Sequence, residues 1–390
     1  MAGRSSIVLA EMAAGVLLAG CSTTVVGSPV VDPSGMPKPE VGSYPTTPRT
    51  VAPVTDAQAS SAEGYRMAEI IPLPPDVDPS QRYNGAIVVG RPDLASAFGA
   101  GVATALKDME VAAYTSATSR VPGASSVDTT PTSLVMGFAR MKDAAAATAA
   151  SAHPAVLAPE KARFGTADPT KRRVTVPGHP DATAYLQTWP ESRATATVAV
   201  QARGQYVLFA YATTGVDAPA KFFDLQSKAL GGFTPTPVDK FGTLPKDREN
   251  LLQYTLPPEA PRDVVLPART AVVDQSDITG SVTNFADAGV DYVARAGNTV
   301  YRARDAAGAA LLADRFVAEA KGFFSDAVDS TVKGVPRSRC VAFTSYKGAK
   351  DTSNYCVVPV GRYVAEMSGA QAEKVKQATG ASYLMLRDLK

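Results

Sequence analysis

The stretch ATATVAVQARGQYVLFAYAT, residues 194–213, decides the fold. Its first half alternates apolar and polar residues up to Arg203, and an apolar run begins at Tyr206. Alternation with a period of two is typical of a half-buried β-strand. Gly204 and Gln205 separate the two runs, and a two-residue connection with glycine first favours a tight hairpin. We therefore predict two adjacent antiparallel strands in this stretch.

Helices and further strands flank this hairpin in the first half of the chain. Asp143 precedes an alanine-rich run, and an aspartate in front of a helix caps its free N–H groups. Asp217 stands in the same relation to an amphipathic stripe that ends at Gly231. The predicted order is a strand at 133–141, a helix capped by Asp143, a strand at 183–189, the hairpin, and a helix capped by Asp217.

The second half of the chain repeats this order. The predicted elements are a strand at 299–304, a helix capped by Asp305, strands at 340–346, 355–360 and 363–367, and a helix that begins with the capping-box pair Ser368 and Gln371 and stops at Gly380. Two local sequences also correspond: Asp143-Ala144-Ala145 with Asp305-Ala306-Ala307, and Gly204-Gln205-Tyr206-Val207 with Gly361-Arg362-Tyr363-Val364. An internal duplication explains both matches, and chance similarity of common elements is the alternative.

This repeat predicts an α+β protein of two similar halves, loosely ferredoxin-like. Each half would be an antiparallel sheet with helices packed on one face, in the order strand, helix, three-strand meander, helix. The other face of each sheet must then be solvated or packed on the sibling half, a ligand or a partner. Prolines interrupt regular structure near 240–262, so we expect a first domain at 61–245 and a second at 246–390.

The amino terminus carries the pattern of a lipoprotein signal. Arg4 precedes a mostly apolar run of 14 residues at 7–20, and Leu18-Ala19-Gly20-Cys21 fits a lipobox. An uncleaved membrane-spanning helix is the alternative, but it needs about 20 apolar residues. We predict a signal peptide at 1–20 and lipidation of Cys21, which anchors the protein to the cell membrane from outside the cytoplasm.

A linker composition follows the predicted anchor. Pro, Gly, Ser and Thr make up 21 of the 40 residues at 21–60, and no helical or strand period is sustained there. We predict a Pro/Ser/Thr-rich tether that holds the folded body away from the membrane. Docking of Tyr44 and of residues 51–54 on the body is the alternative.

Two cysteines remain once Cys21 is assigned to lipid. Cys340 and Cys356 lie on two predicted strands joined by a polar turn, and a hairpin places them opposite each other. We predict a disulfide, because an extracytoplasmic address favours oxidation and the spacing is not C-x-x-C. Two buried free thiols or a redox pair are the alternatives.

Composition and motifs exclude several functions. The 390 residues carry a formal net charge of +2, which offers no basic surface for nucleic acid. No motif for a metal, a nucleotide or a nucleophilic serine is present, so we assign no catalytic residue, no metal ligand and no cofactor. His179, beside Asp181, and His153 are interpreted as exposed loop residues. The basic stretch Lys171-Arg172-Arg173 is interpreted as a solvated loop, and Trp189 as a core residue.

Several stretches together resemble a known family. They are the lipobox, the segment VGSYPTTPR at 41–49, the segment FADAGVD at 285–291, and the late cysteine pair. They resemble an uncharacterised family of actinobacterial, chiefly mycobacterial and nocardial, cell-envelope lipoproteins. The resemblance covers nearly the whole chain. It implies a location outside the cytoplasmic membrane and no particular activity.

Two functions are compatible with these patterns. The first is a non-catalytic lipoprotein that is anchored to the membrane through lipid on Cys21 and binds an envelope lipid, another ligand or a protein partner. The second is a serine-type hydrolase that cleaves an envelope ester or amide and uses His179 as its base. The scarcity of reactive groups favours the binding module.

Overall fold

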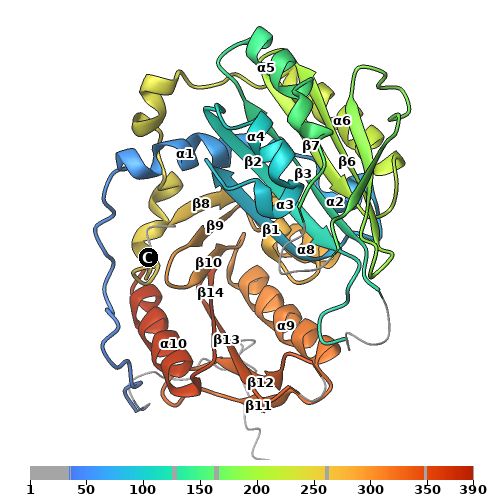
Figure 1. Ribbon diagram of the computed structural model, residues 1–390. Helices are drawn as coiled ribbons and strands as arrows, with labels where there is room; N and C mark the ends of the chain where they lie inside the picture. Colours follow the sequence, from blue (N-terminus) through green and yellow to red (C-terminus); the bar gives the residue numbers. More distant parts are fainter. Residues whose placement is uncertain are drawn as a thin grey trace, which may run out of the picture. The chain divides into compact units, whose positions relative to one another are not determined.

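Two seven-stranded antiparallel sheets organise the fold (Figure 1). The computed structural model describes residues 35, 37–124, 130–161, 167–259, 263–346 and 349–389. Cys21, the signal peptide and the first part of the tether lie outside these residues. The α+β class with two similar halves is confirmed.

The two sheets have the same topology. The first runs β1 (Tyr83–Gly90), β2 (Val111–Thr118), β3 (Ser133–Arg140), β7 (Tyr206–Ala212), β6 (Thr195–Arg203), β5 (Thr183–Thr188) and β4 (Thr170–Arg173). The second runs β8 (Val264–Pro267), β9 (Tyr292–Arg295), β10 (Thr299–Arg302), β14 (Tyr363–Gly369), β13 (Thr352–Val360), β12 (Arg339–Thr344) and β11 (Val328–Ser330). Counted from its own first strand, each sheet has the order 1-2-3-7-6-5-4, which is the order an internal duplication produces.

The predicted hairpins are present in both halves. Arg203 pairs with Tyr206 across the turn between β6 and β7, and Gly204 has a φ of 57°, which glycine adopts without strain. Gly361, at the corresponding turn between β13 and β14, has a φ of 54°. Each sheet is wider than the four strands expected from the sequence, because three strands in each half were not anticipated.

Helices cover both faces of each sheet, which corrects the expectation of one covered face. In the first half α1 and α6 pack on one face, and α3, α4 and α5 on the other; in the second half α8 and α9 lie opposite α10. Strand β7 shows the reason, since Leu208 and Phe209 point to opposite faces and neither is exposed.

The helices have the following bounds. The longer ones are α1 (Asp56–Ala68), α5 (Ala144–Ser151), α6 (Asp217–Leu230), α8 (Ile278–Ala288), α9 (Ala306–Phe323) and α10 (Ala372–Arg387). The short ones are α2 (Pro74–Val77), α3 (Ala95–Phe98), α4 (Ala100–Ala105), α7 (Ala268–Ala271) and the 3-10 helices η2 (Pro154–Val156), η3 (Val238–Thr243), η4 (Arg248–Asn250), η5 (Leu252–Tyr254) and η6 (Val272–Asp274).

The predicted helix caps hold in part. The side chains of Asp143 and Asp305 accept hydrogen bonds from the N–H groups of Ala146 and Gly308, both at 2.8 Å, so these two caps are confirmed. Asp217 is the first residue of α6 and makes no capping bond. Helix α10 has Gln371 at its N-cap without a side-chain bond, and it continues past Gly380 to Arg387, so the expected capping box and the expected stop were wrong.

The two halves share backbone hydrogen bonds. The N–H of Asn84 on β1 donates to Ser276 O at 3.0 Å, and the N–H of Ile278 donates to Arg82 O at 2.8 Å. These bonds cover the outer edge of β1, which is otherwise an unpaired edge strand. Arg82 also forms an ion pair with Asp277, whose carboxylate accepts the Gly280 N–H at 3.0 Å and caps α8. The Asp277 carboxylate thus links the two halves through Arg82 and also caps the N-terminus of α8.

Residues 37–54, here called the strap, lie on the second half. Val41, Tyr44 and Val51 pack against the core on the α10 side of the second sheet. Arg49 donates its N–H to Gln253 O at 2.9 Å and its guanidinium to Asp263 at 3.1 Å. The tether expected over 21–60 is therefore wrong for residues 37–60, since the strap is docked and α1 begins at Asp56. The alternative, docking on the body, is correct for this segment, because the apolar side chains of the strap pack against the second half and are partly buried there.

Candidate functional site

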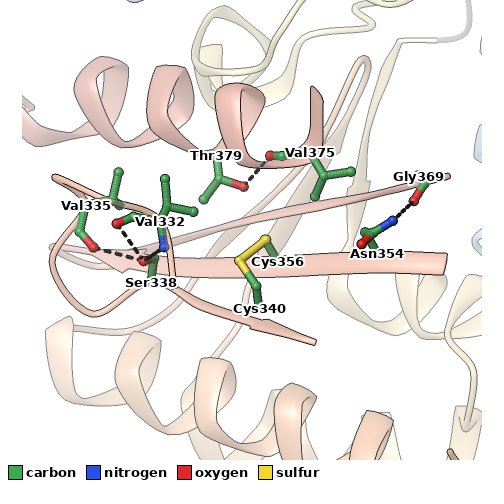
Figure 2. Close-up of a disulfide and its surroundings, with 9 residues drawn as sticks. All are labelled: Val332, Val335, Ser338, Cys340, Asn354, Cys356, Gly369, Val375 and Thr379. Carbon is green, nitrogen blue, oxygen red and sulfur yellow. Dashed lines mark hydrogen bonds between the residues drawn. A yellow bond between two sulfur atoms is a disulfide. The ribbon is translucent and has the colours of Figure 1, made fainter. Parts of the chain in front are cut away.

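The structure joins Cys340 and Cys356 by a disulfide, the arrangement expected from their spacing (Figure 2). The two residues lie directly opposite each other on β12 and β13, with Cα atoms 4.1 Å apart. Both side chains are buried beneath α10, in the same cluster as Val375. A buried bridge of this kind stabilises the sheet and is closed to redox partners, so it is not a reaction centre.

The histidines do not form a hydrolase site. His179 lies 3.3 Å from Asp224 and its ring packs edge-on against Phe223. Asp181 instead accepts a hydrogen bond from Gln201 at 2.8 Å. Within the described ranges no serine hydroxyl contacts His179. His153 caps a 3-10 helix by accepting the Ala155 N–H at 3.1 Å, so it is structural as well.

A cavity of about 520 Å³ lies at one end of the first sheet, on the face covered by α3, α4 and α5. We call it the first-sheet pocket. Small-molecule sites typically enclose ~300–1,000 Å³, so its size is suitable for a ligand. The lining residues come from α3 and the start of α4, from β3, β5 and β7, and from two loops; those used below are Ser133, Val135, Glu160, Lys161, Gln187, Trp189 and Tyr211.

The sheet forms the floor of the first-sheet pocket. Tyr211 on β7 pairs directly with Val135 on β3, so both side chains point to the pocket face. Gln187 extends from β5 on the same face, and Trp189 follows two residues later. Trp189 is half-buried at the pocket, which differs from its interpretation as a core residue.

One wall of the pocket contains Glu160, which forms a buried ion pair with Lys171. Lys171 lies on β4 opposite Gln187, its ammonium is 2.9 Å from Glu160 and 3.1 Å from Val156 O, and it stands 4.2 Å from the centre of the Tyr185 ring. The interpretation of Lys171-Arg172-Arg173 as a loop was wrong, since the stretch is an edge strand. Arg172 and Arg173 are exposed as expected, but the Lys171 side chain is only 4% exposed. Its charge is therefore committed to Glu160.

Polar groups on the floor lack protein partners. Gln187 is only 6% exposed, yet its amide makes no hydrogen bond to any described residue. The hydroxyl of Tyr185, two residues before Gln187 on the same face of β5, is buried and also unpartnered among these residues. Burial raises the pKa of Tyr211 and of Tyr185 above the usual value, so both hydroxyls keep their protons. Unlike the Tyr185 hydroxyl, the Gln187 amide remains accessible from the cavity, so a ligand there can form hydrogen bonds with it in place of water.

The pocket combines an aromatic wall with neutral hydrogen-bonding groups. It offers Trp189 for stacking, and the Gln187 amide and Tyr211 hydroxyl for hydrogen bonds. No nucleophile paired with a base is present among its described lining residues, and nowhere in the described ranges do three or more His, Cys, Asp or Glu residues group to hold a metal ion. The arrangement can stack against a ligand and form hydrogen bonds with it.

A second polar cluster lies where the second sheet meets the first half. Glu366 on β14 accepts a hydrogen bond from the Tyr301 hydroxyl, and Arg295 pairs with Asp274. Burial raises the pKa of Glu366, although hydrogen bonds from Tyr301 and Tyr355 oppose the shift. These groups satisfy one another across β9, β10 and β14, so the cluster holds the sheet together.

Sequence reasoning missed the first-sheet pocket. Its lining comes from stretches near residues 95–100, 133–135, 160–161, 169, 187–189 and 211, which share no motif. The single available signal was the placement of Gln187 and Trp189 on one face of a strand otherwise rich in apolar residues. The other predicted site residue, Cys21, lies outside the described part of the chain.

Fold and pocket define a duplicated α+β protein with a ligand-sized cavity in its first half. The chain belongs to a family of unknown function: the model "Domain of unknown function (DUF7373) N-terminal" matches residues 51–246, and the model "Domain of unknown function (DUF7373) C-terminal" matches residues 242–388. A comparison with curated proteins finds no match. Among the described residues, no helix has the length and hydropathy needed to cross a membrane.

One solved structure shows a weak similarity. It is the extracellular domain of PknH from Mycobacterium tuberculosis, with 12% sequence identity and a TM-score of 0.30. The match covers 46% of this chain and 98% of that domain. A TM-score of this size does not establish a common fold.

Proposed function

We propose that the protein is an extracytoplasmic lipoprotein, held on the membrane by lipid on Cys21, that binds a small ligand in the first-sheet pocket and catalyses no reaction. The observation that carries the binding role is the nearly buried Gln187 amide, which faces a cavity of about 520 Å³ without a partner among the described residues. The amide is accessible from the cavity, so a ligand that enters can form hydrogen bonds with it in place of water.

The proposed location depends on the lipobox and on the disulfide. Leu18-Ala19-Gly20-Cys21 supplies the modification site, and the Cys340–Cys356 bridge is of a type that persists outside the reducing cytosol. Acyl chains on Cys21 hold the protein to the membrane surface without a spanning helix. The strap begins at Pro37, so a short segment of chain separates the lipid from the folded body.

The hydrolase is not retained as a second function. His179 is paired with Asp224, and the neighbouring Asp181 is bound by Gln201. A general base needs to lie within hydrogen-bond reach of the proton that it removes. Within the described residues no hydroxyl nucleophile occupies that place beside His179.

A fragment screen tests the binding role. Trp189 is the one tryptophan of the chain, so its fluorescence reports on the first-sheet pocket alone. We expect neutral polar fragments to change this emission in the mature protein, and Ser133→Phe, which fills the floor, to abolish their binding. Fragments that bind equally well to Ser133→Phe, or a complete absence of hits, would show that the pocket is not a ligand site.

Mass analysis tests the anchor. We expect the mature native chain to begin at Cys21 and to carry the mass of a diacylglyceryl group and an acyl group. The variant Cys21→Ala should lack this mass and leave the membrane fraction. An unmodified amino terminus in the native protein contradicts the anchor and leaves the pocket experiment unaffected.

A further inference from the structure

We infer that the first-sheet pocket binds a neutral saccharide ring, which stacks on Trp189 and donates and accepts hydrogen bonds at Gln187 and Tyr211. This inference rests on the proposed function and names the chemical class of the ligand. It depends on three features of the pocket: its apolar wall, its polar floor and its charge balance.

The apolar wall selects a ligand with a flat, weakly polar face. Trp189 and Pro169 line the pocket beside Val135 of the floor. The face of an indole ring is electronegative, so it attracts the partly positive C–H hydrogens on the face of a pyranose ring. Such a face differs from the edge of the same ring, which carries hydroxyl groups.

The polar floor selects hydroxyl groups on that edge. The Gln187 amide has two donors and one acceptor, and the Tyr211 hydroxyl both donates and accepts. Neither side chain bonds to another described residue. Strand β6 separates Gln187 on β5 from Tyr211 on β7, so different hydroxyl groups of one sugar would bond to the two side chains. An acyl chain would leave the Gln187 amide unsatisfied, which disfavours a lipid tail in this pocket.

The charge buried in the wall of the pocket is already neutralised, whereas the second ion pair lies at the exposed rim. Glu160 pairs with Lys171 at 2.9 Å, and Lys161 pairs with Asp168 at 2.8 Å. A charged ligand would have to enter a partly desolvated site without an unpaired counter-ion, which is unfavourable. The part of the ligand that enters the pocket should therefore carry no net charge.

The rim leaves room for a chain that continues outside the pocket. Ser96 and Ala100 line the pocket and are exposed, and the Lys161 side chain is 91% exposed. A terminal ring can therefore enter while further units remain in solvent. A glycan of the cell envelope meets this requirement, and the proposed anchor places the protein among such polymers.

Matched sugars test the charge and the class together. Glucose, its anionic analogue glucuronate and its cationic analogue glucosamine are titrated into the mature full chain together with maltose, cellobiose and lactose, with Trp189 emission as the readout. We expect at least one neutral sugar to bind, and its charged analogue to bind about tenfold more weakly, which corresponds to ~1.4 kcal/mol.

Variants assign the contacts. Gln187→Leu should weaken binding of the neutral sugar about tenfold, the loss of about one hydrogen bond. Tyr211→Phe should weaken it several-fold. Gln201→Leu is the matched control, since Gln201 is a second buried glutamine of the same sheet and bonds to Asp181 instead. This variant should bind the neutral sugar with the affinity of the unchanged protein.

Three results overturn the saccharide inference. The first is that glucose, glucuronate and glucosamine bind equally well. The second is that Gln187→Leu leaves the affinity for the neutral sugar unchanged. The third is that no neutral sugar changes the Trp189 emission of a protein that does respond to neutral fragments. The third result removes the saccharide and retains a ligand pocket. A protein that responds to neither sugars nor fragments removes the proposed function as well.

Discussion

Gly380 of α10 lies directly against the backbone of Glu40 in the strap: a Cβ atom at Gly380 would stand 2.8 Å from Glu40 O. A second such contact brings Gly334 to Pro37, where a Cβ atom would lie 2.1 Å from the Pro37 carbonyl oxygen. Both glycines therefore let the strap approach the second half at van der Waals distance. This close approach explains why a glycine stands in the middle of a helix at Gly380, where it costs helix propensity.

The first prediction concerns Gly380→Ala. Alanine favours a helix interior over glycine by ~1 kcal/mol, but here its methyl group would collide with Glu40 O. We expect the substitution to lower the free energy of unfolding by ~1–3 kcal/mol and to expose the strap to proteases. Gly322→Ala in α9 is the control, since nothing lies within 4 Å of its Cβ position. An equal, stabilising effect of both substitutions in urea unfolding would contradict the docked strap.

Local signals in the sequence predicted the parts of the fold that depend on neighbouring residues. Asp143 and Asp305 cap helices through N–H groups three residues away, and the hairpins depend on glycine at Gly204 and Gly361. Each of these features is complete within a few residues. The duplicated order of elements could therefore be predicted from periodicity and turns alone.

Long-range contacts decide the features that the sequence did not predict. Gly380 has the local appearance of a helix stop, but its role depends on a strap more than 300 residues away in the chain. Lys171 belongs to a basic stretch typical of a solvated loop, and only its pairing with Glu160 allows it to be buried. Strand β11 has three exposed residues and no apolar alternation, so nothing marks it before β12 is in place.

The candidate site could not be predicted from the sequence either, because it too depends on long-range contacts. The first-sheet pocket combines side chains from β3, β5, β7 and two loops, and its polar groups belong to no motif. Gln187 and Trp189 could be placed on one strand face from the alternation of β5. Their exposure to a cavity depends on where α3 and the loop at Glu160 lie, which local patterns do not determine.

The second prediction concerns the disulfide. Cys340 and Cys356 close a loop with a sequence separation of 16, and a loop of that length contributes ~3 kcal/mol in the chain-entropy account. We expect the double variant Cys340→Ala/Cys356→Ala to unfold with a free energy lower by about that amount. Dithiothreitol should destabilise the unchanged protein to a similar extent.

The double variant provides the internal control for reduction, because it contains no disulfide to break. Its urea midpoint should be the same with and without reductant. The same measurement is made on the unchanged protein under conditions in which mass analysis shows that both thiols are free. If its urea midpoint is also the same with and without reductant, the bridge contributes nothing to stability.

The third prediction concerns Glu319 on α9, at the junction of the two halves. Burial raises the pKa of this carboxyl to about 7, the nearby Asp277 and Glu366 add to the shift, and Arg82 opposes it. In the unfolded chain the same group titrates near 4.5. The folded state therefore holds a proton that the unfolded state releases, so the stability due to this group is lost as the pH rises from about 4.5 to about 7.

Glu319→Gln removes this titration, because the amide is neutral at every pH. We expect unchanged stability near pH 4, where both forms are uncharged, and a gain of ~1–3 kcal/mol at pH 8, where the unchanged protein must bury a carboxylate. Urea unfolding at several pH values measures the difference. Glu373→Gln, at an exposed glutamate of α10, serves as the control and should show no such dependence. If the curves of Glu319→Gln and of the unchanged protein run parallel from pH 4 to pH 8, the carboxyl of Glu319 is charged in the folded state and Arg82 outweighs its burial.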